Sequence, residues 1–460
     1  MSPGLEFAID TIAAISTPHG RGGIGIVRLS GPEATAIAAK LVRMGGTQEH
    51  ARAQFAKVLD PGDPDRTIDE AVVTVFHAPH SYTGDTLVEI AAHGSPVVLE
   101  AILRAALSHG ARLANPGEFT QRAFLSGRID LTQAEAVHDL IAAQTLDQAR
   151  VAAQQLGGAI SRRVAPAKES LLHLIALLEA GMDFASGELD DVEVVPPSQI
   201  EGFISRVKTP LTALAASFGR GQLLRHGVTL ALVGRPNAGK SSLFNRLLER
   251  DRAIVTALPG TTRDTVEEVL ALNGIPLRLV DTAGLRLDDE PIDEAEQQGI
   301  LRSREALADA GLVLLIHDAT QPLGQQEYEL LDSVRERPHL LVQNKIDLLP
   351  ATQAVTTDSI PVSALTGEGI EPLRAAILTA INAEGSLVDT AALTNLRQQQ
   401  AVAHALEALD TAAAANANHL PHELILMDLH AALKALDSLP GVTTTEDILG
   451  RIFSIFCIGK

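Results

Sequence analysis

The stretch that decides the fold is residues 228–242, which read VTLALVGRPNAGKSS. The apolar run Val228–Val233 leads into a segment matching G-x-x-x-x-G-K-[ST], and the helical stretch Ser242–Glu249 follows. Strand, glycine-rich loop and helix in this order predict a phosphate-binding loop, in which backbone N–H groups wrap the phosphates and the lysine adds positive charge. A chance match occurs on the order of one time in fifty in a chain this long. On this motif alone, an ordinary strand–turn–helix stays open.

Two further motifs complete the phosphate half of a nucleotide site. Asp281-Thr-Ala-Gly284 closes the apolar run Leu277–Val280, where its carboxylate can hold Mg²⁺ through water and its glycine N–H can contact a γ-phosphate. Thr261 and Thr262 lie in the loop before that strand, at the place of a switch threonine that completes the Mg²⁺ shell.

Two motifs beyond them predict that the base is guanine. Asn344-Lys-Ile-Asp347 follows the run Leu340–Val342, and its carboxylate can accept from guanine N1 and N2, donors that adenine does not offer together. Ser363-Ala-Leu365 follows the last apolar run, where its backbone can contact the guanine oxygen. Five motifs in this order predict a GTPase domain.

The spacing of apolar runs predicts the architecture around these motifs. Runs alternate with helical segments between residues 227 and about 385, which is typical of a mostly parallel sheet. The runs are Val228–Val233, Leu277–Val280, Leu312–Ile316, Leu340–Val342 and Ile360–Val362. Helical, alanine- and leucine-rich sequence flanks this α/β unit on both sides, so we interpret the unit as an insertion into a helical domain.

The flanking segments carry more detailed expectations. Residues 1–125 read as mixed α+β, with strands expected at Ile24–Leu29, Ala71–Phe76 and Leu87–Ala91 and a helix at Val97–Leu107. Thr132-Gln-Ala-Glu135 matches a capping box at a helix start. Helices are expected from there to Leu156, over Ala165–Ala180, and over Ser198–Phe218 with a kink or break at Pro210.

Composition excludes several classes of protein. The 460 residues suit about three domains. With 37 Lys and Arg against 57 Asp and Glu, the net charge of −20 excludes a chain that grips nucleic acid by charge alone. One cysteine excludes an internal disulfide or a cysteine-based metal cage, and favours a cytosolic location. The N-terminus lacks a basic signal-peptide region, and no apolar run reaches 18 residues, so no membrane span is expected.

The catalytic group is not obvious from the motifs. Ras-like enzymes place a Gln after the Asp-x-x-Gly motif to position water, but this chain has Leu285 there. The acidic segment Asp288–Glu296 offers carboxylates, although most of them suit a solvated loop. Asn237 in the phosphate loop could ligate a K⁺ beside the phosphates in place of an arginine finger; a local turn-former is the alternative.

Several segments outside the GTPase motifs carry a family resemblance. From Asp10 to Lys460 the chain resembles the MnmE (TrmE) family of tRNA-modification GTPases, in the TrmE-Era-EngA-YihA-Septin-like superfamily. The resemblance rests on GRGGIGIVRLSG at Gly20–Gly31, Ser81-Tyr-Thr-Gly84, Asn115-Pro-Gly-Glu-Phe-Thr120, Arg128–Ala136 and the ending Cys457-Ile-Gly-Lys460. It implies a multidomain fold: an α+β N-terminal folate-binding and dimerisation domain (1–125), an all-α helical domain (126–226 and 389–460), and an inserted α/β Ras-like P-loop GTPase domain (227–388).

The resemblance also implies an activity and its partners. A K⁺-activated GTPase of this family works as a cytoplasmic homodimer, in a heterotetramer with an FAD-dependent MnmG-type partner. Together they add a carboxymethylaminomethyl-type group to C5 of the wobble uridine of certain tRNAs, with the carbon from a 5,10-methylene or 5-formyl tetrahydrofolate derivative. The acidic net charge fits binding of tRNA mainly through that partner, and the lack of a long apolar run fits a protein with no membrane involvement.

Residue roles are carried over by the same resemblance. Glu296 matches the water-positioning glutamate. The positions that match K⁺ ligands are Asn237, Thr256, Leu258 and Thr261, and those that match Mg²⁺ ligands are Ser241 and Thr262. The positions that match folate-binding residues are Arg28, Glu89, Arg128 and Lys460. The GTP-binding positions are Asn237, Ala238, Gly239, Lys240, Ser241, Ser242, Thr256, Ala257, Leu258, Pro259, Gly260, Thr261, Thr262, Asp281, Thr282, Ala283, Gly284, Asn344, Lys345, Asp347, Ser363, Ala364 and Leu365.

Some alternatives stay open at this stage. Cys457 is either a thiol near the transferred carbon or a small buried apolar residue. A ribosome-assembly GTPase of the Era or Der type shares the phosphate motifs but predicts a basic RNA-binding domain after them, whereas residues 389–460 hold eight acidic against four basic residues. A purely regulatory Ras-like switch predicts slow hydrolysis that is indifferent to K⁺.

Overall fold

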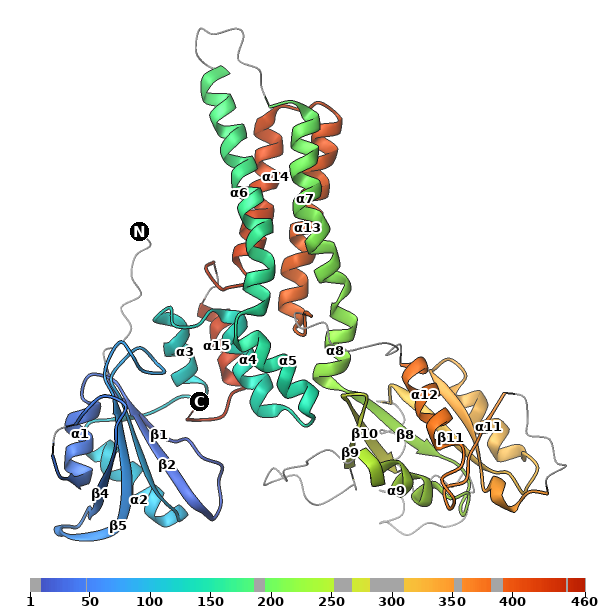
Figure 1. Cartoon of the computed structure of the whole chain (residues 1–460), viewed down its shortest axis with the longest axis horizontal. Coiled ribbons are helices and arrows are strands. Elements are labelled where there is room, and N and C mark those ends of the chain that lie inside the picture. The colour runs from blue at the N-terminus through green and yellow to red at the C-terminus, as the bar shows by residue number, and fades with distance from the viewer. Residues whose placement is uncertain are drawn as a thin grey trace. The chain divides into compact units, whose positions relative to one another are not determined.

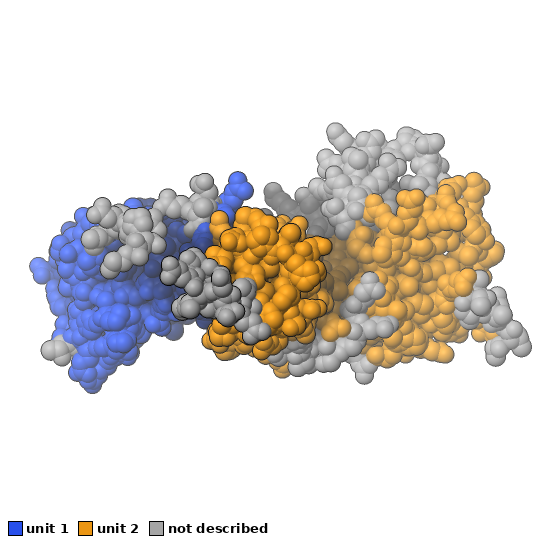
Figure 2. Space-filling model, turned by 90° about the horizontal axis from the view of Figure 1, so that it is seen from above, with its two compact units in different colours: residues 1–138, 156–161, 436–460 blue, residues 139–155, 162–435 orange. Residues whose placement is uncertain are grey.

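The structure is a computed structural model that describes residues 10–46, 48–185, 195–251, 267–281, 310–350, 358–381, 392–443 and 446–459. The chain divides into two compact units (Figure 2). Unit 1 combines residues 1–138, 156–161 and 436–460, and unit 2 combines residues 139–155 and 162–435. Both therefore contain segments that are far apart in the sequence. No helix within the described ranges is both long and apolar enough to cross a membrane.

Unit 1 is built on a seven-stranded sheet in the order β3-β4-β5-β6-β2-β1-β7 (Figure 1). Helices α1 and α2 pack on one face, because alternate strand residues such as Val27, Leu29 and Ile90 point into one core with Ile37 and Ile102. The strands are β1 (Ile12–Ile15), β2 (Gly22–Ser30), β3 (Val42–Met44), β4 (Ala53–Asp60), β5 (Asp63–Phe76), β6 (Leu87–Gly94) and β7 (Arg112–Leu113); the helices are α1 (Ala34–Leu41), α2 (Pro96–Ser108), α3 (Glu118–Leu125), α4 (Leu131–Ala142) and α15 (Glu446–Ser454).

The opposite face of this sheet is covered in part by Phe119 of α3 and is exposed elsewhere within the described part of unit 1. A row of register partners crosses four strands there, with Phe55 on β4, Val72 on β5, Ala91 on β6 and Ile26 on β2. Phe55 is 60% exposed and Val72 is 46% exposed. Apolar side chains in a row on an uncovered sheet face are typical of an interaction surface.

Unit 2 contains long helices that run side by side and a second sheet (Figure 1). Helix α7 packs along α13 through one apolar stripe of each, including Ile204, Leu211 and Leu214 from α7. The helices of this part are α5 (Leu146–Leu156), α6 (Ala159–Ala185), α7 (Pro197–Ala216), α8 (Phe218–His226), α13 (Leu396–Ala417) and α14 (His422–Asp437).

The sheet of unit 2 has the order β13-β12-β11-β8-β10-β9. Strands β13, β12, β11, β8 and β10 pair in parallel, and their carboxyl ends therefore meet at one edge. The strands are β8 (Val228–Val233), β9 (Glu267–Leu272), β10 (Ile275–Asp281), β11 (Leu312–Asp318), β12 (His339–Asn344) and β13 (Ile360–Pro361); the helices are α9 (Lys240–Asp251), α11 (Gln325–Val334), α12 (Ile370–Ala380) and the 3-10 turn η1 (Ile346–Leu348).

One local expectation was wrong. The capping box is formed by Asp130 and Gln133 instead of Thr132 and Glu135: Asp130 Oδ1 accepts from the Gln133 N–H at 2.9 Å, and the Asp130 N–H donates to Gln133 Oε1 at 2.9 Å. This register places buried Leu131 and Ala134 on one helical face. The helices expected as far as Leu156 are confirmed, as α4 and α5.

Helix α7 continues through Pro210, so the expected break is absent. The buried stripe of residues spaced by three and four positions, from Ile200 to Leu214, keeps the helix together although proline removes one backbone hydrogen bond.

Strand β9 was not predicted. It forms an antiparallel hairpin with β10 through Asn273 and Gly274, which have φ of 49° and 83°. An Asn-Gly pair between two apolar runs is the typical signal for such a turn, so the sequence did contain the necessary information.

Candidate functional site

The phosphate loop lies at the carboxyl edge of the parallel sheet. It joins β8 to α9, and Lys240 is the first residue of that helix. Lys240 Nζ donates to the carbonyls of Gly234 at 2.8 Å and Arg235 at 2.9 Å. The ammonium group is therefore held inside the arc of the loop, where helix N-terminal N–H groups favour an anion. Asn237 has a φ of 62°, and its side chain is exposed on the loop.

Asn344 ties the base-recognition motifs to the phosphate loop. This side chain is 1% exposed; its Nδ2 donates to the Ala238 carbonyl at 2.9 Å, and its Oδ1 accepts from the Ala364 N–H at 3.0 Å. Gly239 passes directly over it with a φ of 90°, and a Cβ there would lie 2.2 Å from Asn344 Nδ2. One amide thus holds three loops that come from distant parts of the sequence.

The remaining base-site residues are fixed by short polar contacts. Asp347 Oδ1 accepts from Ser363 Oγ at 2.6 Å, which leaves the second carboxylate oxygen for a ligand. Lys345 Nζ donates to Asp318 Oδ2 at 2.6 Å. The hydrogen bond and the positive charge of Lys345 outweigh the effect of burial and hold the pKa of Asp318 below its usual value.

Two supporting residues were missed by the sequence reasoning. Asp318 ends β11, and a carboxylate at the end of a parallel strand is a signal that could have identified it. Arg246 on α9 donates from Nε to the Ala364 carbonyl at 2.8 Å and from its second nitrogen to the Leu365 carbonyl. It fixes the backbone of the predicted guanine-contacting loop, and no local motif indicates this.

The structure brings together the expected site residues of the phosphate loop and the base motifs. Ser241 and Ser242 are exposed in the first turn of α9, and the Ser241 hydroxyl is an oxygen ligand of the kind that Mg²⁺ prefers. The backbone of Asp281 ends β10 beside Leu232. Outside the described residues lie Thr256, Ala257, Leu258, Pro259, Gly260, Thr261, Thr262, Thr282, Ala283, Gly284, Glu296 and Lys460.

A second candidate site lies on the sheet of unit 1. Arg28 on β2 and Glu89 on β6 are direct register partners, and Arg28 Nε and a terminal nitrogen both bond to Glu89 Oε1, at 3.0 and 2.6 Å. Glu89 Oε2 has no hydrogen bond to the described residues. The Arg28 guanidinium lies 5.8 Å from the ring of Tyr82 and 5.7 Å from that of Phe119. This pair therefore offers one carboxylate oxygen as an acceptor, beside a guanidinium that two aromatic rings hold in place.

The other folate position described here is Arg128. It is exposed, and its guanidinium has no ion pair or hydrogen bond to the described chain. Tyr82 lies close enough for the Arg128 charge to act on it; burial nevertheless raises the pKa of Tyr82 above its usual value.

The end of the chain joins this site in unit 1. Ser16 Oγ donates to the Gly459 carbonyl at 3.0 Å, Ile458 forms an antiparallel bridge with Pro116, and the Gly117 N–H donates to the Cys457 carbonyl at 3.4 Å. Ser16 directly follows β1, in which Ala14 pairs with Arg28, so the contact with Gly459 lies two residues along the strand from the partner of Arg28. Cys457 itself is exposed, so its interpretation as a buried apolar residue is wrong.

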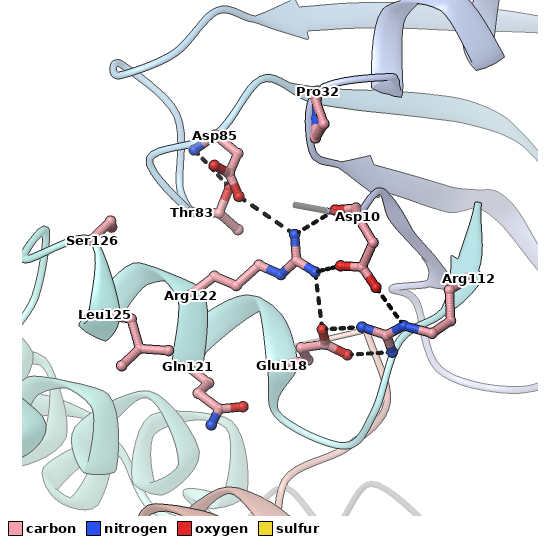
Figure 3. A pocket seen from close by; sticks show the side chains of 10 residues that line it. All are labelled: Asp10, Pro32, Thr83, Asp85, Arg112, Glu118, Gln121, Arg122, Leu125 and Ser126. Atoms are coloured by element: carbon pink, nitrogen blue, oxygen red, sulfur yellow. Dashed lines mark hydrogen bonds and ion pairs between the residues drawn. The ribbon is translucent and has the colours of Figure 1, made fainter. Parts of the chain in front are cut away.

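A cavity of about 360 Å³ lies at the start of α3 and is lined by side chains that form ion pairs with one another (Figure 3). Arg112 bonds both Glu118 oxygens, at 2.6 and 3.0 Å, and Asp10 at 2.7 Å, while Arg122 bonds Asp10 at 2.6 Å and Glu118 at 3.1 Å. Burial raises the pKa of Asp10 and Glu118, but the arginine hydrogen bonds outweigh it and lower both. This cluster fixes α3, which carries Phe119 toward Arg28.

Comparisons with known proteins identify the family of the chain. The family model described as "MnmE helical domain" matches residues 131–457, and the one described as "GTP-binding protein TrmE N-terminus" matches residues 11–128. A tRNA modification GTPase MnmE of Koribacter versatilis is 54% identical over 458 residues, covering 98% of this chain and 99% of the relative. The MnmE of Aquifex aeolicus is 40% identical over 456 residues, covering 98% and 100%.

Solved structures give a more partial likeness. Aquifex aeolicus Era bound to GDP and AlF4⁻ is 28% identical, with a TM-score of 0.29, and the match covers 39% of this chain and 66% of that chain.

Proposed function

The chain belongs to the MnmE family of tRNA modification GTPases, and from this premise we propose that it is a K⁺-activated GTPase that modifies the wobble uridine of certain tRNAs. GTP hydrolysis in tRNA modification follows from the family itself, which sets aside the Era-type and Ras-type alternatives. The K⁺ dependence, the one-carbon donor and the partner are the proposal. We place its action in the cytosol, as a homodimer working with an FAD-dependent MnmG-type partner.

The GTPase half of the proposal assigns roles around the phosphate loop. Lys240 binds the β/γ oxygens, while Ser241 and Thr262 would hold Mg²⁺. Asn237 would hold K⁺ with Thr256, Leu258 and Thr261, and a bound cation would supply the positive charge that an arginine finger supplies elsewhere. In support, the Asn237 amide is exposed and makes no hydrogen bond with the described residues. Glu296 would position the attacking water, since Leu285 cannot.

The one-carbon half rests on the site in unit 1. Glu89 Oε2 can accept from the N–H donors of a pterin, and the Arg28 guanidinium that holds Glu89 is itself placed by Tyr82 and Phe119. The Arg128 guanidinium suits the glutamate carboxylate of a folate, as would Lys460. The bound tetrahydrofolate derivative would supply the carbon that is attached to uridine C5 in the carboxymethylaminomethyl-type product.

Two further observations support the proposed dimer and the proposed division of tRNA binding. The open apolar row from Phe55 to Ile26 suits dimerisation through unit 1. The net charge of −20 suits a protein that leaves most of the tRNA contact to its partner.

The observation that carries the proposal is the contact of the Cys457–Gly459 tail with Ser16 and Pro116, in the unit that also holds the Arg28–Glu89 pair. Glu89→Gln tests it in the full chain. We expect binding of 5-formyltetrahydrofolate to weaken about tenfold or more, the loss of one charge-assisted hydrogen bond, while GTP turnover stays unchanged. Glu100→Gln is the matched control, because Glu100 on α2 is half-exposed and its one ion-pair partner among the described residues is Arg104.

Two results would contradict the one-carbon assignment. One is unchanged folate affinity in Glu89→Gln. The other is failure of the wild-type chain, mixed with its flavin-dependent partner, tRNA, GTP, K⁺, a tetrahydrofolate donor and an amine as nitrogen donor, to produce a C5-modified uridine detectable by mass spectrometry of the digested tRNA.

A further inference from the structure

Arg235, the second residue of the phosphate loop, is bound to a buried acid on another element. Its terminal nitrogen lies 3.0 Å from Glu327 Oε2, and Glu327 sits in the first turn of α11. Gly324, just before that helix, leaves room for the guanidinium, because a Cβ there would lie 2.0 Å from the same nitrogen. Neither Glu327 nor Gly324 belongs to a nucleotide-binding motif.

Glu327 is itself held by a buried histidine. Glu327 and His317 are each 2% exposed. Glu327 Oε1 lies 3.0 Å from His317 Nδ1, and Glu327 Oε2 also accepts from the Gly324 N–H at 2.7 Å. The other ring nitrogen of His317 lies 2.8 Å from the Gln321 carbonyl, which can only accept, so that nitrogen carries a proton. A carboxylate this buried needs cationic and hydrogen-bonding partners, and here they fix it in one orientation.

This cluster leads directly to the phosphate-binding lysine. The carbonyl of Arg235 is one of the two that hold Lys240 Nζ, at 2.9 Å. Anchoring the Arg235 side chain therefore fixes the peptide that positions the lysine. The next residue after His317 is Asp318, which holds Lys345 of the guanine motif. The last two residues of β11 thus support the two halves of the nucleotide site separately.

We propose that Glu327, oriented by His317, is a positioning residue for phosphate binding: it anchors Arg235 and thereby the loop carbonyl that holds Lys240. Glu327 does not touch the nucleotide in this account. If Glu327 only capped α11, its removal would not weaken phosphate binding more than base binding. This difference makes the proposal testable.

The experiment measures GDP and guanosine separately, both as competitors of a fluorescent GDP analogue on the full chain. Guanosine has no phosphate, so its binding depends only on the half of the site that contains Asp347 and Asp318. We expect Glu327→Gln to raise the dissociation constant of GDP about tenfold and to change that of guanosine less than twofold. Glu329→Gln, an exposed residue of the same helix that accepts only from Gln325, should change neither.

A second variant guards against misfolding of the first. Gly324→Ala displaces the guanidinium without removing any charge and requires no strained backbone, because Gly324 has a φ of −103°. We expect the same loss of GDP affinity, and little further loss when Gly324→Ala and Glu327→Gln are combined, because both act through Arg235. Unchanged GDP affinity in both variants, equal weakening of GDP and guanosine, or fully additive effects would overturn the proposal.

Discussion

Asp347→Asn should change the base that the enzyme accepts. In the structure Asp347 Oδ1 takes the Ser363 hydroxyl at 2.6 Å, and an asparagine oxygen can keep that bond, so the loop should stay folded. The substitution removes a charged acceptor of guanine N1–H and N2–H. Hydrogen bonds to charged groups contribute about 1.5–3 kcal/mol each, so two of them total about 3–6 kcal/mol. GTP should therefore bind about 150- to 25,000-fold more weakly.

Xanthosine triphosphate provides the converse measurement. Its O2 accepts where the guanine amine donates, and the asparagine NH₂ can donate to it. We therefore expect the variant to hydrolyse xanthosine triphosphate with a KM far below its KM for GTP, in steady-state phosphate-release assays. Asp332→Asn on exposed α11 is the matched control and should prefer GTP as the wild type does. If Asp347→Asn keeps the wild-type KM for GTP, the assignment of Asp347 to the base is wrong.

Three further predictions concern other parts of the structure. Gly239→Ala should weaken GDP binding at least about 100-fold, since its Cβ would lie 2.2 Å from Asn344 Nδ2 at a φ of 90°; calorimetric titration showing near-normal affinity would refute the role of this close approach. Removal of residues 457–460 should abolish tetrahydrofolate binding in equilibrium dialysis while leaving GTP turnover intact, and retained binding would contradict the role of the tail. The pKa values of Asp10 and Glu118 are lower in the folded chain than the ordinary values of 3.8 and 4.5, so the ionised carboxylates stabilise the fold fully above those values, and this stabilisation is lost as the pH falls below about 4. Glu118→Gln should therefore reduce the dependence of the free energy of urea unfolding on acid pH. An unaltered dependence would show that the ion-pair cluster of Figure 3 does not stabilise the chain.

The nucleotide site was predictable from the sequence to the extent that its residues lie in local motifs. Asn237–Ser242, Asn344–Asp347 and Ser363–Leu365 were located because each follows a recognisable apolar run, and the structure places their described residues at one sheet edge. The β9–β10 hairpin was missed although Asn273-Gly274 indicated it.

Contacts between distant segments account for what could not be predicted. Arg246 supports the Ala364 carbonyl across 118 residues, and Ser16 holds Gly459 across 443 residues. Neither pairing leaves a periodic pattern, because a single hydrogen bond between distant loops imposes no spacing on the residues around it. The exposure of Cys457 could not be predicted for the same reason. An apolar tail is expected to be buried until the segments that contact it are known.

The most direct test of the account is GTP turnover in KCl against NaCl at equal ionic strength, for the wild-type chain and for Asn237→Ala. A cation that replaces an arginine finger should contribute strongly to the rate. We therefore expect turnover at least about tenfold faster in KCl for the wild type, and no difference between the salts for Asn237→Ala. Equal wild-type rates in the two salts would contradict the account.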